Sequence, residues 1–294
     1  MILVAGATGF LGREICRRLV AQGRHVRGLV RPTSDPDAVQ HLHDLGIQTV
    51  EGDLRDPASL ENACDGVETV ISTATVARSR QPGDSVEATD QQGQINLVDA
   101  AHVAGVEQFI YISYSGQIGV DDPLTTAKRA VERRVRESGM VYTILRPSVF
   151  METWLSPRLG FDFSNARATV YGAGERKISW VSLRDVAAFA VRAIDDRAAI
   201  DATIEIGGPE ALSPNEVVRI FEEASGRRFE VEHVPEEALR AQAATADDSL
   251  QRSFTALMLG YANGDEIPME ETLRQYPLEL MSVRDYARGV LEGA

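Results

Sequence analysis

Short runs rich in Val, Ile and Leu alternate with stretches of helical spacing through the first half of the chain. Such runs are typical of strands in a parallel sheet buried on both faces; they lie at 2–5, 25–30, 47–50, 67–71, 108–113 and 141–147. Between them, apolar residues recur every three or four positions, as in the long stretch 87–104 that Gly105 closes. The alternation predicts an α/β fold with a doubly wound parallel sheet of the Rossmann type over residues 1–150.

The pattern becomes less regular beyond residue 150, which predicts a smaller α+β lobe over 151–294. Ser213 and Glu216 have the spacing of a capping box and predict a helix that runs to Ala224. Aromatic and apolar residues gather at the start of this half. We expect them to line an apolar substrate pocket, with ordinary core packing as the alternative; those assigned to the pocket are Phe150, Met151 and Trp154.

Three glycines follow the first strand at intervals of three, namely Gly6, Gly9 and Gly12. A strand, a glycine-rich turn and a helix start together form the usual entry of a dinucleotide-binding domain. The first glycine allows a tight turn, the second lets the backbone approach a pyrophosphate, and the third lets helix pack on strand. A purely structural turn is the alternative. The flanking strand and helix favour the cofactor site, to which the other turn residues also belong: Thr8, Phe10 and Leu11.

The end of the second strand indicates which dinucleotide is bound. Sites that prefer NAD carry an acidic residue about 20 positions after the glycines, where it accepts from the ribose 2′-hydroxyl. In this chain that place falls at Val30 and Arg31. An arginine suits a 2′-phosphate, so the sequence predicts NADP(H). The alternative is a solvated arginine at a strand end, and the nearby Asp35 and Asp37 temper the prediction.

Composition excludes several classes of protein. The net charge of −14 argues against direct nucleic-acid binding, because phosphate contacts need clustered Lys and Arg. The two cysteines, Cys16 and Cys64, fall in predicted helices without metal-ligand spacing, so no metal site is expected. The sequence offers no signal peptide and no run of about 18 apolar residues, the length that a membrane span requires. We therefore expect a reduced, cytoplasmic protein without membrane association.

Six short motifs together carry a resemblance to a known group of proteins. They are GATGFLG, LVRPTS, EGDLRD, FIYIS, PLTTAK and YTILRP. The chain resembles the atypical short-chain dehydrogenase/reductases of the NmrA-like group, which includes quinone reductases, isoflavone-reductase-like enzymes and NADP-sensing regulators. The resemblance covers residues 1–190. It implies a Rossmann domain and a smaller lobe with the active cleft between them, and residues 176–206 are expected to return to the first domain.

The resemblance also implies further cofactor contacts. Asp53 and Leu54 correspond to the pair that contacts the adenine, and the small residues Ser72, Thr73 and Ala74 would lie against the ribose. The ends of the fifth and sixth strands, where a doubly wound sheet places reacting groups, contribute the remaining contacts. There we assign Ser113 and Pro147 to the cofactor and Tyr114 to the substrate.

One departure from the superfamily concerns the proton donor. Superfamily reductases usually carry Tyr-x-x-x-Lys, but Leu124 stands four residues before Lys128 here. Lys128 is one of only two lysines among 30 basic residues, and we assign it as both cofactor-binding and catalytic. We expect a helix over 127–137 capped by Thr125 or Thr126, which places Lys128 near its start. The alternative is a surface ion pair between Lys128 and Glu132.

The sequence therefore predicts an NADPH-dependent reductase of a small apolar carbonyl, quinone or enone. The nicotinamide would supply hydride, and the protein would supply orientation and a dry site. The rival interpretation, favoured by Leu124, is a non-catalytic NADP(H)-binding regulator that acts through protein partners. A weaker third interpretation is an assembly subunit stabilised by the nucleotide. A homodimer or another protein partner is left open.

Overall fold

A computed structural model describes residues 1–77, 81–117 and 122–293 of the chain. The residues fall into two compact units. The first comprises Met1–Ser113, Pro123–Leu145 and Val186–Ile204, and the second comprises Tyr114–Asp122, Arg146–Asp185 and Glu205–Ala294. The first unit thus takes in a late segment, Val186–Ile204, as well as most of residues 1–145.

A seven-stranded sheet with the order β3-β2-β1-β4-β5-β6-β9 organises the first unit. The recorded pairs from β3 to β6 are parallel, as the apolar runs predict. The chain order reverses between β1 and β4, where Ile2 pairs with Thr69 and Ala5 with Ser72. The strands are β1 (Ile2–Ala5), β2 (Val26–Val30), β3 (Gln48–Glu51), β4 (Thr69–Ser72), β5 (Gln108–Ile112), β6 (Val141–Pro147) and β9 (Ala202–Ile206). The α/β prediction is confirmed.

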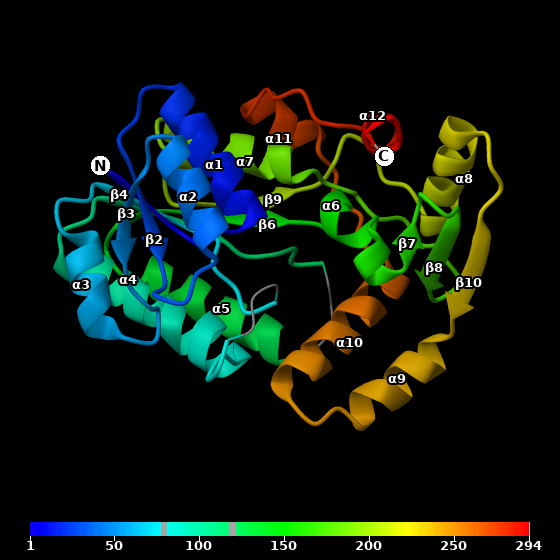
Figure 1. Cartoon of the computed structure of the whole chain (residues 1–294), viewed down its shortest axis with the longest axis horizontal. Coiled ribbons are helices and arrows are strands. Elements are labelled where there is room, and N and C mark those ends of the chain that lie inside the picture. Colours follow the sequence, from blue (N-terminus) through cyan, green and yellow to red (C-terminus); the bar gives the residue numbers. More distant parts are fainter. Residues whose placement is uncertain (78–80, 118–121, 294) are drawn as a thin grey trace. The chain divides into compact units, whose positions relative to one another are not determined.

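Helices cover both faces of this sheet, with α1 and α2 on one side and α3, α4 and α5 on the other (Figure 1). Their apolar faces and the strands form a core that includes Leu3, Leu97 and Phe109. The helices are α1 (Phe10–Ala21), α2 (Pro36–Asp44), α3 (Pro57–Cys64), α4 (Gln94–Val103), α5 (Pro123–Arg136), α7 (Leu183–Arg192) and the 3₁₀ turn η3 (Arg197–Ala199).

Two helix predictions were wrong in detail. The stretch 87–104 is not one α-helix: it begins as the π-helix η1 (Val86–Gly93) and continues as α4. Helix α5 begins at Pro123, so Thr125 and Thr126 lie inside it and not at its N-cap. Proline is well suited to a first helical position, because its missing N–H would have no intrahelical partner there. Lys128 consequently lies in the second turn of the helix, away from its start.

The second unit contains a small sheet with the order β10-β8-β7, in which β10 is parallel and β7 antiparallel to β8. Its core includes Met151, Trp180 and Phe221. The capping box of Ser213 and Glu216 is present at the start of α8, as predicted. The elements are α6 (Met151–Trp154), η2 (Pro157–Leu159), β7 (Phe161–Asp162), β8 (Arg167–Tyr171), α8 (Pro214–Ser225), β10 (Glu230–Val234), α9 (Glu236–Ala244), α10 (Ser249–Asn263), α11 (Glu270–Gln275) and α12 (Val283–Glu292).

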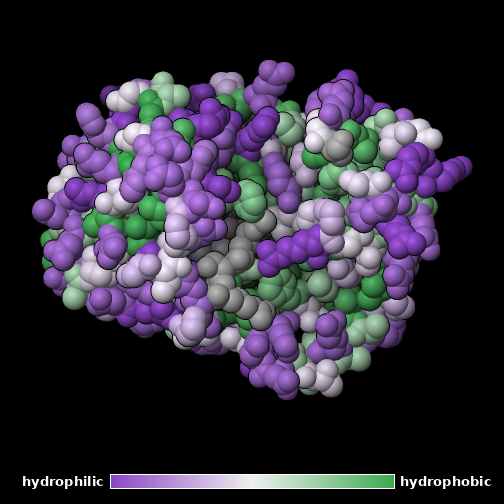
Figure 2. Space-filling model, in the orientation of Figure 1, coloured by the Kyte–Doolittle hydropathy of each residue, from purple (hydrophilic) through white to green (hydrophobic). Residues whose placement is uncertain are grey.

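Hydrophilic side chains predominate on the face shown in Figure 2, and hydrophobic side chains form smaller patches. In the part of the chain that the structure describes, no helix combines the length and apolar character needed to cross a membrane.

Candidate functional site

The glycine turn lies at the point where the strand order of the sheet reverses. Gly6 has φ +82° and would clash with Thr73 Oγ1, 2.5 Å away, if it carried a Cβ atom. A Cβ on Gly12 would lie 2.1 Å from the carbonyl oxygen of Gly6. These two positions accept only glycine, because the turn is left-handed at the first and tightly packed at the second. Ligands bind at such reversal points in open α/β sheets.

Gly9 differs from its two neighbours in the motif. Its φ of −77° is open to any residue, and an added Cβ would meet only the Gly6 carbonyl oxygen, at 3.2 Å. Folding therefore does not demand glycine at this position, whereas a closely approaching ligand would. Gly9 is the N-cap of α1, whose first turn contains no acidic residue and no side-chain cap. Such a helix start can hold a phosphate, so the turn fits a dinucleotide.

Hydrogen bonds made by the side chains of Gln94 and Thr73 hold the segment after β4 in place. The hydroxyl of Ser72 donates to Gln94 Oε1 at 2.7 Å, and Gln94 Nε2 donates to the Ala74 carbonyl at 2.7 Å. Thr73 Oγ1 donates to the Ala5 carbonyl at 3.1 Å. Ser72 is fully buried, so its side chain supports the turn through Gln94 and offers only backbone to a ligand. By contrast, Phe10 at the start of α1 is 55% exposed.

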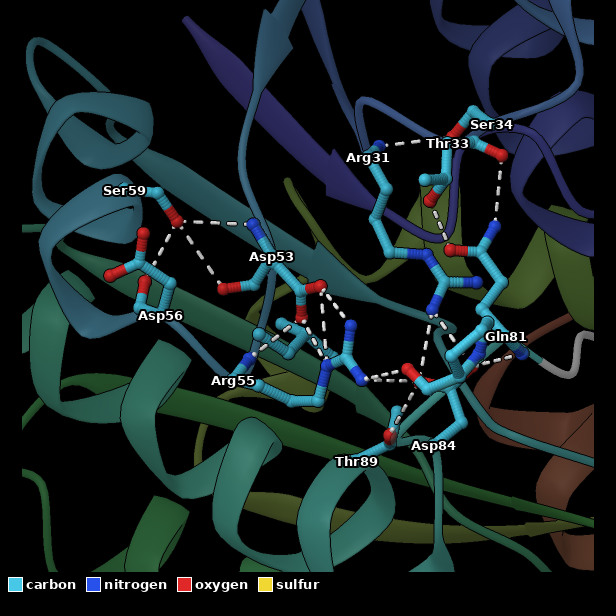
Figure 3. A network of polar contacts seen from close by, with 12 residues as sticks. Arg31, Thr33, Ser34, Asp53, Arg55, Asp56, Ser59, Gln81, Asp84 and Thr89 are labelled. Atoms are coloured by element: carbon cyan, nitrogen blue, oxygen red, sulfur yellow. Dashed lines mark hydrogen bonds and ion pairs between the residues drawn. The ribbon is translucent and has the colours of Figure 1, made fainter.

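Arg31 follows β2 and pairs with a carboxylate distant in sequence. Its Nη1 donates to both oxygens of Asp84, at 3.1 and 2.9 Å (Figure 3). The Asp84 side chain is 1% exposed, and it also accepts from the Gln81 N–H at 3.0 Å and the Thr89 hydroxyl at 3.3 Å. Arg31 is thus an ordered member of a polar network, contrary to the alternative of a solvated arginine. Whether it binds a 2′-phosphate stays a prediction.

Asp53 and Leu54 lie just after β3, and Asp53 belongs to the same polar network as Arg31. Arg55 forms a two-point ion pair with the Asp53 carboxylate, with Nη2–Oδ2 at 2.6 Å and Nε–Oδ1 at 3.0 Å. The hydrogen bond from Arg55 lowers the pKa of Asp53, which keeps this carboxylate ionised. Leu54 is buried in the core of the first unit, which limits its side chain to a supporting role.

Lys128 is buried, and sequence reasoning missed its main partner. The Nζ atom donates to the Ile112 carbonyl at the end of β5 at 3.3 Å, and it lies 3.8 Å from Asp90 Oδ1. It also lies 5.1 Å from the centre of the Tyr111 ring. Burial lowers the pKa of Lys128, whereas burial raises the pKa of Asp90. Asp90 comes from the π-helix, and such helices often occur at functional sites.

Glu132 pairs with Ser113, Arg129 and Arg136, whereas the alternative interpretation paired it with Lys128. This carboxylate is 1% exposed and accepts from Ser113 Oγ at 2.7 Å. Arg129 and Arg136 also donate to it. Lys128 and Glu132 are both buried, so the alternative of a surface ion pair between them does not agree with the structure. Ser113 is itself buried by these contacts, so its hydroxyl serves the interior of the first unit.

The predicted substrate residues lie in the second unit. Met151 is fully buried in its core, and Trp154 stacks on Tyr261 with ring centres 4.9 Å apart. Phe150 precedes α6, and the Tyr114 hydroxyl lies 3.5 Å from Asp122 Oδ2. The burial of Met151 agrees with the alternative of ordinary core packing, while Trp154 is partly exposed.

A buried aspartate in the second unit was also missed from the sequence. Asp265 is 1% exposed, and its two oxygens accept from the hydroxyls of Ser115 and Ser148, each at 2.6 Å. Ser115 N–H donates to the Pro147 carbonyl at 2.9 Å, so these contacts fix the segments after β5 and β6. Burial raises the pKa of Asp265, and the two hydroxyls oppose that rise. Pro147 is thereby positioned through its backbone.

The described residues contain no group of three or more His, Cys, Asp or Glu that could hold a metal ion. The NmrA-like family model matches residues 1–287. The chain belongs to the NmrA-like family. The resemblance seen in the sequence motifs is confirmed, and it extends beyond the first 190 residues.

Proteins similar in sequence to this chain have different roles. An NAD(P)H azoreductase of Xenophilus azovorans is 33% identical over 230 residues, which cover 77% of this chain and 74% of that protein. A photosystem II assembly factor of Guillardia theta, Ycf39, is 31% identical over 240 residues, which cover 80% and 73% of the two chains. The family thus does not by itself decide between an enzyme and an assembly protein.

Solved structures share the fold over the whole chain. The NADPH complex of an NADPH-dependent quinone oxidoreductase from Escherichia coli has a TM-score of 0.80 at 22% identity, covering 99% of this chain and all of the other. The NADP(H) complex of a triphenylmethane reductase from Citrobacter has a TM-score of 0.80 at 20% identity, covering 98% and 99%. At these identities the likeness establishes the fold.

Proposed function

We propose that this chain is an NADPH-dependent oxidoreductase that reduces a small apolar carbonyl, quinone or enone. The observation that carries the proposal is the buried Lys128 beside the end of β5, with Asp90 as its counterion. A lysine that served only solubility or surface pairing would not be buried at the edge of the sheet where reacting groups lie. The azoreductase relative and the reductase fold support the same class.

Different residues of the first unit would bind different parts of the cofactor. The glycine turn and the start of α1 would hold the pyrophosphate, and Arg31 would contact the 2′-phosphate. Asp53 and the backbone of 72–74 would contact the adenosine, and Gln94 holds that backbone in place. NADPH, when bound, supplies a hydride from its nicotinamide.

Lys128 is the group that we assign to proton transfer. Burial lowers the pKa of its ammonium, which makes it a stronger acid than an exposed lysine. Asp90 holds the Nζ atom from one side, and the Ile112 carbonyl accepts one of its hydrogens. Lys128 can therefore donate a hydrogen bond or a proton to a developing oxyanion, the part that the tyrosine plays elsewhere in the superfamily. Trp154 and Phe150 are proposed to contact the apolar substrate.

A non-catalytic regulator or assembly protein is the second candidate. Leu124 at the usual tyrosine position and the similarity to the assembly factor favour it. NADPH oxidation measured at 340 nm against a panel of quinones, ketones, enones and azo compounds distinguishes the two. Turnover with any apolar acceptor, and its loss in Lys128→Met, supports the reductase. Tight NADPH binding without turnover across the panel overturns it. Cytoplasmic location and a homodimer stay predictions.

A further inference from the structure

The polar network around Arg31 contains acidic as well as basic side chains, and it bears on which cofactor the chain selects. Two arginines, Arg31 and Arg55, share the buried carboxylate of Asp84: Arg31 Nη1 lies 2.9 Å from Oδ2, and Arg55 Nη1 lies 3.4 Å from Oδ1. Arg55 is in addition paired with Asp53. Figure 3 shows the two guanidinium groups converging on the carboxylates. Among the described residues of this network, two positive charges thus face two negative charges.

Asp84 is fixed in this position by its own loop. Its carboxylate accepts from the Gln81 N–H and the Thr89 hydroxyl as well as from the arginines. The Gln81 side chain ties the loop to the segment after β2, donating from Nε2 to the Thr33 carbonyl at 2.9 Å. Gly83 has φ +84°, and a Cβ there would lie 2.8 Å from Arg55 Nη1. The loop therefore packs directly on Arg55, and Asp84 is a built part of the site.

We propose that Asp84 sets the cofactor selectivity of this chain by neutralising Arg31 and Arg55, so that NADH binds nearly as well as NADPH. The inference rests on the proposed nicotinamide site and goes beyond it. A phosphate monoester carries between one and two negative charges at neutral pH, so Asp84 and Asp53 repel it while Arg31 attracts it. The 2′-hydroxyl of NADH carries no charge, and a carboxylate can accept a hydrogen bond from it.

An opposite role for Asp84 predicts that removing its charge changes the NADPH affinity in the opposite direction. Asp84 could orient Arg31 so that its remaining N–H groups face the phosphate, in which case its loss would weaken NADPH binding. The burial of Asp84 and its contact with both arginines favour neutralisation, because the carboxylate removes a full charge from the site. The two roles are separated by one conservative substitution.

The experiment is calorimetric titration of NADPH and NADH into the full chain, its Asp84→Asn variant and its Asp84→Ser variant. Both variants remove the charge and keep a polar side chain for the Thr89 and Gln81 contacts. We expect wild-type affinities for the two cofactors within about tenfold of each other. Asp84→Asn should bind NADPH about tenfold more tightly and leave NADH within about threefold, since a single charge is removed near the phosphate.

Asp99→Asn is the matched control, because Asp99 also pairs with one arginine, Arg134, within the first unit. It should change neither affinity. Unchanged or weakened NADPH binding in folded Asp84 variants overturns the inference, and so does a wild-type preference for NADPH above about a hundredfold. If the variants do not fold, the ratio of the wild-type dissociation constants for NADH and NADPH still tests the inference. Failure of both cofactors to bind overturns the proposed function itself, whereas binding without turnover overturns only the reductase activity.

Discussion

Lys128 Nζ lies 3.8 Å from Asp90 Oδ1, and both side chains are almost completely buried, at 7% and 0% exposure. A buried ion pair of this kind contributes little net stability, because desolvation offsets the attraction. It does impose a strong constraint, since removing either partner leaves an uncompensated buried charge. Such an arrangement is costly to keep for stability alone, which is a reason to look for its use in the chemistry of the site.

The first prediction concerns Lys128. Lys128→Met should lower the free energy of unfolding by about 3 kcal/mol or more, because Asp90 loses its counterion. Lys128→Arg keeps the charge, but the larger guanidinium does not fit a site shaped for an ammonium and cannot titrate. Both variants should lose turnover, measured by NADPH oxidation on the folded fraction.

Lys177 provides a matched control, because it is the other lysine of the chain and is exposed. Lys177→Met and Lys177→Arg should change stability by no more than about 0.5 kcal/mol. If NADPH affinity and turnover both survive in Lys128→Arg and Lys128→Met, the assignment of Lys128 to the site is wrong.

The second prediction uses the difference between the three glycines of the turn. Gly9→Ala keeps an allowed φ and requires the Gly6 carbonyl oxygen to move by a few tenths of an ångström, so the melting temperature should change by only a few degrees. A side chain in the turn would keep a pyrophosphate from approaching the backbone, so NADPH affinity should fall at least about tenfold. Titration of NADPH into the variant measures this. Gly289→Ala, at an exposed position with open space, should leave affinity unchanged.

In contrast, Gly12→Ala should prevent folding of the turn itself, given the 2.1 Å approach of its Cβ to Gly6. A Gly9→Ala variant that binds NADPH normally would show that the turn is structural.

The strands and the glycine turn could be read from the sequence because their signals are local. Each apolar run supplies its own strand, and the spacing of Gly6, Gly9 and Gly12 supplies the turn. The partners of the site residues could not be read in the same way. Asp84 lies 53 positions from Arg31, and Asp90 lies 38 positions from Lys128. Only the folded sheet brings such pairs together, and many other carboxylates were equally available in this acidic chain.

The errors within α5 and η1 have a different origin. Helix α5 begins at Pro123 and not at the predicted residue 127, because proline is well suited to a first helical position. The π-helix at Val86–Gly93 adds a residue per turn over a short length, and apolar periodicity does not resolve that change. Nothing in the sequence therefore singled out Asp90 among the carboxylates of this acidic chain.

The third prediction concerns cofactor recognition. Arg31→Ala should weaken NADPH binding about ten- to hundredfold and leave NADH nearly unchanged, because a charged hydrogen bond contributes about 1.5–3 kcal/mol. The ratio of the two dissociation constants is the measurement. An equal loss for both cofactors would show that Arg31 supports the fold of the site through Asp84 and does not read the 2′-phosphate.

The fourth prediction concerns the missing tyrosine. Leu124 is 4% exposed and lies one helical turn before Lys128, so a larger side chain there should cost about 1–3 kcal/mol of stability. Leu124→Tyr should leave NADPH affinity within a few-fold and should not increase carbonyl reduction. Leu124→Phe adds the same ring without the hydroxyl and is the control for volume. A gain in kcat with Tyr but not with Phe would mean that the site lacks only a proton donor.

The last prediction concerns Asp265, which tests the buried network of the second unit. Burial raises the pKa of this carboxyl in the native state above its unfolded value of about 3.9. Between these two pKa values the native state holds a proton that the unfolded state has lost. The contribution of Asp265 to the free energy of unfolding therefore decreases as the pH rises through this window, by up to about 1.4 kcal/mol per pH unit.

Asp265→Asn removes this dependence, because the amide stays neutral and still offers an oxygen to one of the two serine hydroxyls. In urea unfolding, the free energy of unfolding of the variant should accordingly rise relative to that of wild type as the pH increases from 4 to 7. Subtracting one from the other removes the opposite trend of the surface carboxylates, which the two proteins share. Asp247→Asn, at an exposed position, should follow wild type throughout. A constant difference between wild type and Asp265→Asn across this range would mean that Asp265 is ionised in the native protein, held so by Ser115 and Ser148.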